Sequence, residues 1–143
     1  MVITADNFID AHEIAEGKEL PAQETIILKG HSIECRITAE DPIKFLPCPG
    51  KIISWIAPGG KDVRIDTHAH AGYIVPMIYD SMIGKLIVYG KTREEAIARM
   101  HRALSEFSVT GIKTTIAFHK KMMENPDFIN NNFNTKYLEK YNG

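Results

Sequence analysis

Glu34 and Arg36 are the first residues of this sequence whose types and spacing could support chemistry. They lie in the segment 33–38, where apolar and polar side chains alternate. The alternation predicts a half-buried strand with Cys35 and Ile37 toward the core and the two charged residues together on the other face. A guanidinium that a carboxylate holds on a rigid strand can stabilise an oxygen that becomes negative during a reaction. The alternative is an ordinary exposed ion pair, which contributes little.

Asp80 precedes a second stretch of interest, the apolar segment 81–89, which Gly84 and Lys85 interrupt. A carboxylate at the entrance of a strand can orient an arginine through a bidentate pair. The alternatives are that Asp80 caps a turn and that Lys85 is a solvated strand residue. The residues alone leave both interpretations open.

Other kinds of site find little support in the sequence. His68 and His70 would share one face of a strand, a geometry that can bind zinc, but no cysteine pair or carboxylate at ligand spacing completes such a site. We therefore expect no metal site. The Gly-rich patterns that cradle nucleotide phosphates and the Gly-x-Ser-x-Gly nucleophile pattern are also absent. On its own residues, the chain is not expected to bind and activate ATP.

The composition indicates one globular domain over residues 1–143. Hydrophobic residues make up 44% and charged residues 24% of the sequence, which is ordinary for a soluble protein. A net charge of −1 with scattered basic residues argues against nucleic acid or an anionic membrane as a partner. Two cysteines are too few for a disulfide framework, and neither a membrane span nor a signal peptide is recognisable, so a cytoplasmic location is expected.

The elements that must position these side chains are predicted from patterns along the chain. Thr92 and Glu95 form a capping box, and apolar residues at helical spacing follow it up to Phe107. Segment 68–77, with Gly72 and Pro76, is expected to be irregular or a bent edge. We expect further helices over 6–16, 113–123 and 136–141, and further strands over 25–28, 51–57, 63–67 and 81–89, with 51–57 and 63–67 joined as a hairpin through 58–60. This order predicts an α+β fold in which an antiparallel, meandering sheet packs with helices.

Several motifs, in order, resemble one known family. The motif Glu34-Cys35-Arg36 is followed by Ala39-Glu40-Asp41-Pro42, and further matching stretches lie at 45–52, 57–60, 67–73, 79–86, 96–100 and 111–114. Together they resemble the C-terminal domain of biotin carboxylases, the ATP-grasp components of biotin-dependent carboxylases. The stretch 133–139 is similar to the close of the stand-alone biotin carboxylase subunits of acetyl-CoA carboxylase, which act in fatty acid synthesis.

The resemblance implies roles for particular residues. The family's arginine at the position of Arg36 lies beside the ureido ring of biotin and is thought to stabilise the enolate-like oxygen that forms when the ring nitrogen loses its proton. Glu34 and Asp80 would support it. The family's arginine at the position of Arg64 helps to form a two-fold dimer interface, so a homodimer through this domain is expected.

The resemblance also implies what the parent enzyme needs. It would be a ligase that uses MgATP and bicarbonate to carboxylate biotin on the biotin carboxyl carrier protein. The ATP-grasp core and N-terminal domain of the family are not found in this sequence, so we expect a C-terminal part that binds none of these cofactors alone and is inactive alone. Two alternatives remain, a biotinyl-type carrier with Lys85 as the modified residue at a strand turn, and a purely structural dimerisation domain in which Arg36 is inert.

Overall fold

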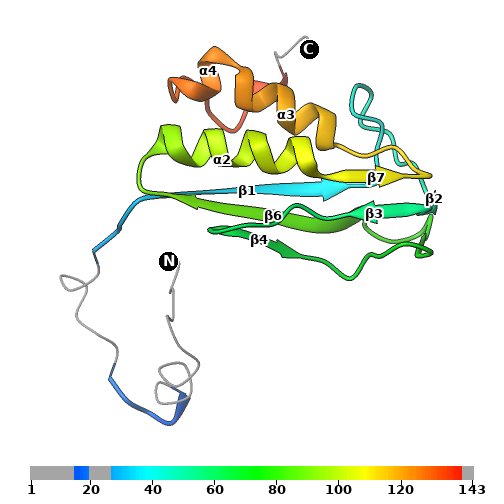
Figure 1. The fold of residues 1–143 in the computed structure, drawn as a ribbon, viewed down its shortest axis with the longest axis horizontal. Coiled ribbons are helices and arrows are strands. Elements are labelled where there is room, and N and C mark those ends of the chain that lie inside the picture. Colours follow the sequence, from blue (N-terminus) through cyan, green and yellow to red (C-terminus); the bar gives the residue numbers. More distant parts are fainter. Residues whose placement is uncertain (1–14, 20–26, 140–143) are drawn as a thin grey trace.

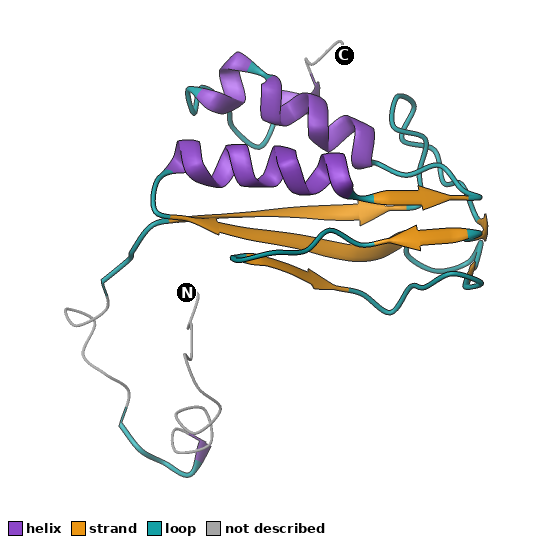
Figure 2. Ribbon diagram, in the orientation of Figure 1, coloured by secondary structure: helices purple, strands orange, loops and turns teal. Residues whose placement is uncertain are grey.

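The structure is a computed structural model that describes residues 15–19 and 27–139. Two helices, α2 and α3, lie on one side of a set of antiparallel strands (Figure 1), and Figure 2 shows the same two layers by type of element. The elements are β1 (His31–Thr38), β2 (Gly50–Lys51), β3 (Ser54–Ile56), β4 (Val63–Asp66), β5 (Ile74–Val75), β6 (Met82–Gly90), α2 (Arg93–Glu106), β7 (Ser108–Thr110), α3 (Ile116–Glu124), α4 (Pro126–Ile129) and a short 3-10 helix, η2 (Tyr137–Glu139).

The main sheet has three antiparallel strands in the order β1-β6-β4. Along β1 the side chains of Cys35 and Ile37 are buried while Glu34 and Arg36 are exposed, as the alternation predicts. The β1–β6 register shifts between Ile37 and Thr38, which marks an irregularity at the end of the strand that carries Arg36.

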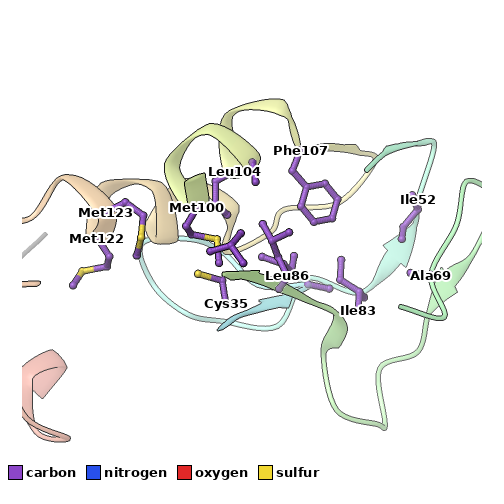
Figure 3. Packing of buried hydrophobic residues seen from close by; sticks show 14 of the residues in the cluster. Cys35, Ile52, Ala69, Ile83, Leu86, Met100, Leu104, Phe107, Met122 and Met123 are labelled. Atoms are coloured by element: carbon purple, nitrogen blue, oxygen red, sulfur yellow. The ribbon is translucent and has the colours of Figure 1, made fainter. Parts of the chain in front are cut away.

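Helix α2 covers the apolar face of this sheet and begins as the capping box predicts. The Thr92 hydroxyl accepts a hydrogen bond from the Glu95 backbone N–H, and the Glu95 carboxylate accepts one from the Lys91 N–H, so the first turn is capped. Met100 and Leu104 of α2 point toward Leu86 of β6 in the buried core (Figure 3). Burial of this apolar stripe is what fixes α2 on the sheet.

Helix α3 packs against α2 and reaches the end of β1. Its N-cap, Thr115, is the buried polar residue of the described part of the chain, and Met122 and Met123 add apolar contacts to the core (Figure 3). The chain then turns through α4, whose Pro126 follows the Asn125 cap.

The predicted α+β class, with antiparallel strands packed against helices, is confirmed. Strands β1 and β6 and helices α2 and α3 fall where the patterns place them, with α3 beginning three residues later than expected. The predicted strand over 51–57 is divided into β2 and β3. The helix predicted over 6–16 falls almost wholly outside the described residues, and of the strand predicted over 25–28 only residues 27 and 28 are described, neither of them in a strand.

The predicted hairpin between 51–57 and 63–67 is wrong. Strand β4 pairs with β6, whereas β3 pairs with β7, a strand that the patterns did not reveal, and β2 pairs with β5. Among the described residues, the strands therefore form one three-stranded and two two-stranded sheets. The turn at 58–60 therefore joins two strands that pair with different partners, β3 with β7 and β4 with β6.

Candidate functional site

Arg36 stands on the face of the main sheet that the helices leave open. Its register partner is Lys85 of β6, and Lys85 is in turn opposite Asp66 of β4, so one row of charged side chains crosses the open face. Glu34 lies on the same face, opposite Ile87. Such a row offers a cation to a molecule that approaches the sheet from this side.

The structure brings Arg36 together with Asp80. One guanidinium nitrogen of Arg36 lies 3.6 Å from a carboxylate oxygen of Asp80, and both side chains are more than half exposed, at 59% and 66%. The same carboxylate group accepts a hydrogen bond of 2.8 Å from the Met82 backbone N–H, which fixes Asp80 at the entrance of β6. The contact is a single one and not the bidentate pair expected, so Asp80 orients the guanidinium while leaving most of its N–H groups free for another oxygen.

Glu34 is not the carboxylate that holds the Arg36 guanidinium, although the strand pattern predicted this role for it. Among the described residues the carboxylate that pairs with Arg36 is Asp80, and Glu34 contributes instead to the environment of Cys35. Burial, followed by the negative charge of Glu34, raises the pKa of the Cys35 thiol to about 12. Cys35 is therefore a neutral core residue, as its place on the strand predicts.

Hydrogen bonds from both sides hold the end of β1 around Arg36. The Ala39 N–H donates to the Ser81 carbonyl at 2.8 Å, and the Ser81 hydroxyl donates to the Glu40 carboxylate. On the other side, the His119 ring nitrogen Nε2 lies 2.9 Å from the Arg36 carbonyl oxygen. Sequence reasoning missed His119, because a single histidine on a helix carries no motif and only the fold shows what it contacts.

An open pocket of about 350 Å³ adjoins Asp80. Its walls come from segment 68–76 and from the start of β6, and they include His68, Tyr73 and Met82. The rings of His68 and Tyr73 meet edge to face at 5.1 Å. Because Asp80 lies on this wall and also contacts Arg36, the pocket and the arginine form one continuous surface.

Arg64 lies on the same open face but apart from Arg36, since β6 separates β4 from β1. Its guanidinium donates two hydrogen bonds to Asp66, at 2.8 and 2.6 Å. These bonds lower the pKa of the Asp66 carboxyl and raise that of Arg64. The Arg64 side chain is still 72% exposed, so it can contact another molecule.

Two further expectations concern histidine and lysine. His68 and His70 are not on a strand, so the shared strand face that would pair them does not exist. Lys85 lies inside β6 and not at a turn. Within residues 15–19 and 27–139, no group of three or more His, Cys, Asp or Glu side chains is placed to hold a metal ion, and no helix there is long and apolar enough to cross a membrane.

A family model described as the biotin carboxylase C-terminal domain matches residues 34–140. This chain belongs to that family. Among curated relatives, biotin carboxylase 1 of Bacillus subtilis (strain 168) is 52% identical over 143 residues, which cover 99% of this chain and 32% of the relative. The biotin carboxylase of Nostoc sp. (strain PCC 7120) is 48% identical over 144 residues, again 99% of this chain and 32% of the relative. The chain thus spans about a third of the length of these relatives.

Solved structures of biotin carboxylases share the fold. A biotin carboxylase–βγ-ATP complex from Campylobacter jejuni superposes with a TM-score of 0.85 at 58% identity, over 90% of this chain and 29% of that one. The biotin carboxylase subunit of a pyruvate carboxylase superposes with a TM-score of 0.83 at 44% identity, over 90% and 29% of the two chains. These matches confirm the expected family and its α+β fold.

Proposed function

We propose that this chain, as a single domain over residues 1–143, is the C-terminal part of a biotin carboxylase, a ligase that uses ATP and bicarbonate to carboxylate biotin on a carrier protein. The observation that carries the proposal is the exposed Arg36 guanidinium, oriented by Asp80 on the open sheet face of a biotin carboxylase C-terminal domain. An oriented arginine that leaves N–H groups free fits a reaction in which negative charge develops on an oxygen.

Arg36 is the catalytic residue of this proposal. Biotin must lose the ureido N–H proton before that nitrogen can attack a carboxyl carbon, and the charge then spreads onto the ureido oxygen. The Arg36 guanidinium would donate hydrogen bonds to this oxygen and so stabilise the charged form. Asp80 would hold the guanidinium in a fixed direction. Glu34, two residues away on the same face, is proposed as a further supporting residue of this surface.

The described residues do not fit ATP or Mg²⁺. They offer no cluster of carboxylates for the metal, and the sequence has no phosphate cradle. ATP and Mg²⁺ would therefore be bound by an ATP-grasp portion of the enzyme, and we expect this chain alone not to cleave ATP. The chain's own contribution would be Arg36, a wall of the biotin pocket beside Asp80, and a surface for a second copy.

The proposed partners follow from the same family. They are the ATP-grasp portion of the enzyme, the biotin carboxyl carrier protein, and a second copy of the chain bound through the surface that carries Arg64. A cytoplasmic acetyl-CoA carboxylase, active in fatty acid synthesis, is the parent complex we propose, because the residues of segment 133–139 resemble a stretch of its biotin carboxylase subunits.

The two alternatives are less well supported. A biotinyl-type carrier would need its lysine at an exposed turn, whereas Lys85 is half-buried in the middle of β6 with strands on both sides. A purely structural domain would not need an oriented, exposed arginine, although an inert ion pair between Arg36 and Asp80 is compatible with it.

The test of the proposal is Arg36→Ala in the full-length enzyme. We expect biotin-dependent turnover to fall by about 100-fold, because a donor to the developing negative charge is lost. Arg102→Ala is the matched control, since Arg102 is also an exposed arginine but lies on α2, away from the open sheet face. Turnover of Arg36→Ala equal to that of Arg102→Ala would remove the catalytic role and leave the structural alternative.

A further inference from the structure

Strand β1 has one edge that another strand does not cover. Within the described residues it pairs only with β6, so alternate backbone groups of β1 point away from the sheet. The residues on this free side near the end of the strand are Arg36 and Thr38. Their backbone groups need partners from elsewhere, because a partly buried N–H or C=O without a hydrogen bond costs free energy.

The start of α3 supplies these partners through Thr115. Its hydroxyl accepts hydrogen bonds from the Thr38 N–H at 3.0 Å and from the Thr38 hydroxyl at 3.2 Å, and it donates to the Arg36 carbonyl at 3.4 Å. The Thr115 backbone N–H donates to the Thr38 carbonyl at 3.2 Å. One donor and two acceptor positions are all that a hydroxyl has, so Thr115 is fully used in holding β1.

His119 adds a second, shorter contact to the same carbonyl. It lies one helical turn after Thr115, and its Nε2 is 2.9 Å from the Arg36 carbonyl oxygen. A carbonyl only accepts hydrogen bonds, so Nε2 must carry a proton and donate it. Burial lowers the pKa of the imidazole and this hydrogen bond opposes the effect only in part, so His119 is neutral at pH 7 with the proton on Nε2.

The position of the Arg36 guanidinium depends on this backbone. The side chain is more than half exposed, and Asp80 contacts it only once, so side-chain packing alone does not fix it. The β1–β6 register shifts just after Arg36, between Ile37 and Thr38, so the sheet ladder is least regular at this point. Contacts from α3 to the Arg36 carbonyl therefore add support on the side of β1 that the ladder does not reach.

We propose that His119 is a positioning residue for Arg36: its Nε2–H holds the Arg36 carbonyl and thereby sets where the guanidinium meets the ureido oxygen of biotin. The inference rests on the proposed function, because it gives Arg36 a catalytic role. Helix α3 thus takes part in the chemistry without touching the substrate.

The test uses the full-length enzyme and variants of His119 that either remove or keep a side-chain donor. His119→Leu removes the donor but keeps an apolar side chain of similar size, whereas His119→Gln keeps a side-chain N–H that can reach the carbonyl. We expect His119→Leu to lower biotin-dependent kcat by about tenfold, since small errors in placing a catalytic group have effects of this order. His119→Gln is expected to restore most of the rate. If His119→Leu does not fold, His119→Glu replaces it, because a carboxylate has the shape of Gln but no donor at neutral pH.

Two controls separate positioning from general stability. His101→Leu removes another helical histidine contact, the 2.7 Å pair with Glu124, and should leave turnover unchanged. In a double-mutant cycle, His119→Leu should cost less than about twofold once Arg36 is already alanine, because its effect acts through Arg36.

The outcomes distinguish the two proposals. If Arg36→Ala has normal turnover, the proposed function fails, and the role of His119 fails with it. If Arg36→Ala is slow but His119→Leu behaves like His101→Leu, only the role of His119 is refuted. The role of His119 is also refuted if the turnover of His119→Gln is no higher than that of His119→Leu. It is refuted as well if His119→Leu lowers turnover by the same tenfold in the Arg36→Ala background.

Discussion

At the scale of single residues, the two cysteines differ in their exposure to solvent. Cys35 is buried between the sheet and α2, and its pKa is raised to about 12, so its reactive thiolate is scarce at neutral pH. Cys48 is half-buried in the loop after β1, where its sulfur accepts a hydrogen bond from the Lys113 N–H at 3.4 Å.

Thiol alkylation at pH 8, followed by mass spectrometry, should therefore modify Cys48 and leave Cys35 unmodified in the folded protein. In denaturant both should react at similar rates, because burial is what protects Cys35. Cys48→Ser is the control, since it should leave the folded protein without any modified cysteine. Rapid modification of Cys35 in that variant would show that the core opens readily and that the strand beneath Arg36 is not well held.

At the scale of elements, the passage from β7 to α3 depends on Gly111. Its backbone has φ +97°, and a Cβ there would lie 2.3 Å from the Lys51 carbonyl oxygen and 2.8 Å from the Ile53 nitrogen. Gly72 has a similar φ of +90°, but a Cβ there would meet nothing within 4 Å. Comparing an alanine substitution at the two positions therefore separates the cost of backbone strain from the cost of steric crowding.

Gly111→Ala should lower the free energy of unfolding by about 3 kcal/mol, since the strain of a positive φ adds to overpacking against Lys51 and Ile53. Gly72→Ala should cost about 1 kcal/mol, because only the strain remains. Urea unfolding of the 143-residue chain, followed by circular dichroism, measures both. Equal costs for the two variants would contradict the close approach of Gly111 to the segment 51–53.

Elements with a long local pattern could be predicted from the sequence, and elements defined by their partners could not. The alternation around Arg36 and the capping box at Thr92 each encode an element within a few residues, and both are confirmed. Strand β7 has three residues, too few for an alternation to be recognised, and it exists because β3 lies beside it. The contact of His119 with the Arg36 carbonyl spans 83 positions of the sequence, so only the fold reveals it.

At the scale of the whole molecule, one layer of helices leaves the other face of the main sheet open (Figure 2). That face carries Arg36 on one edge strand and Arg64 on the other, with β6 between them. A catalytic surface and a surface for a second copy can thus share one sheet without overlapping.

Arg64→Glu tests the dimer surface directly. The change places a carboxylate beside Asp66, which Arg64 now neutralises with two hydrogen bonds, and gives this part of the face a net negative charge. If a second copy binds here, two such charges meet near the symmetry axis, and we expect the dimer dissociation constant of the full-length enzyme to rise by about tenfold or more, because like charges in an interface are strongly unfavourable. Sedimentation velocity over a range of concentrations measures this.

Arg102→Glu is the matched control for that experiment, since it reverses the same charge on α2, on the covered side of the sheet, and disturbs a comparable exposed pair with Glu106. It should leave the sedimentation coefficient unchanged. If Arg64→Glu sediments as Arg102→Glu does, Arg64 is not at the interface. The open face would then keep only the proposed role that Arg36 carries.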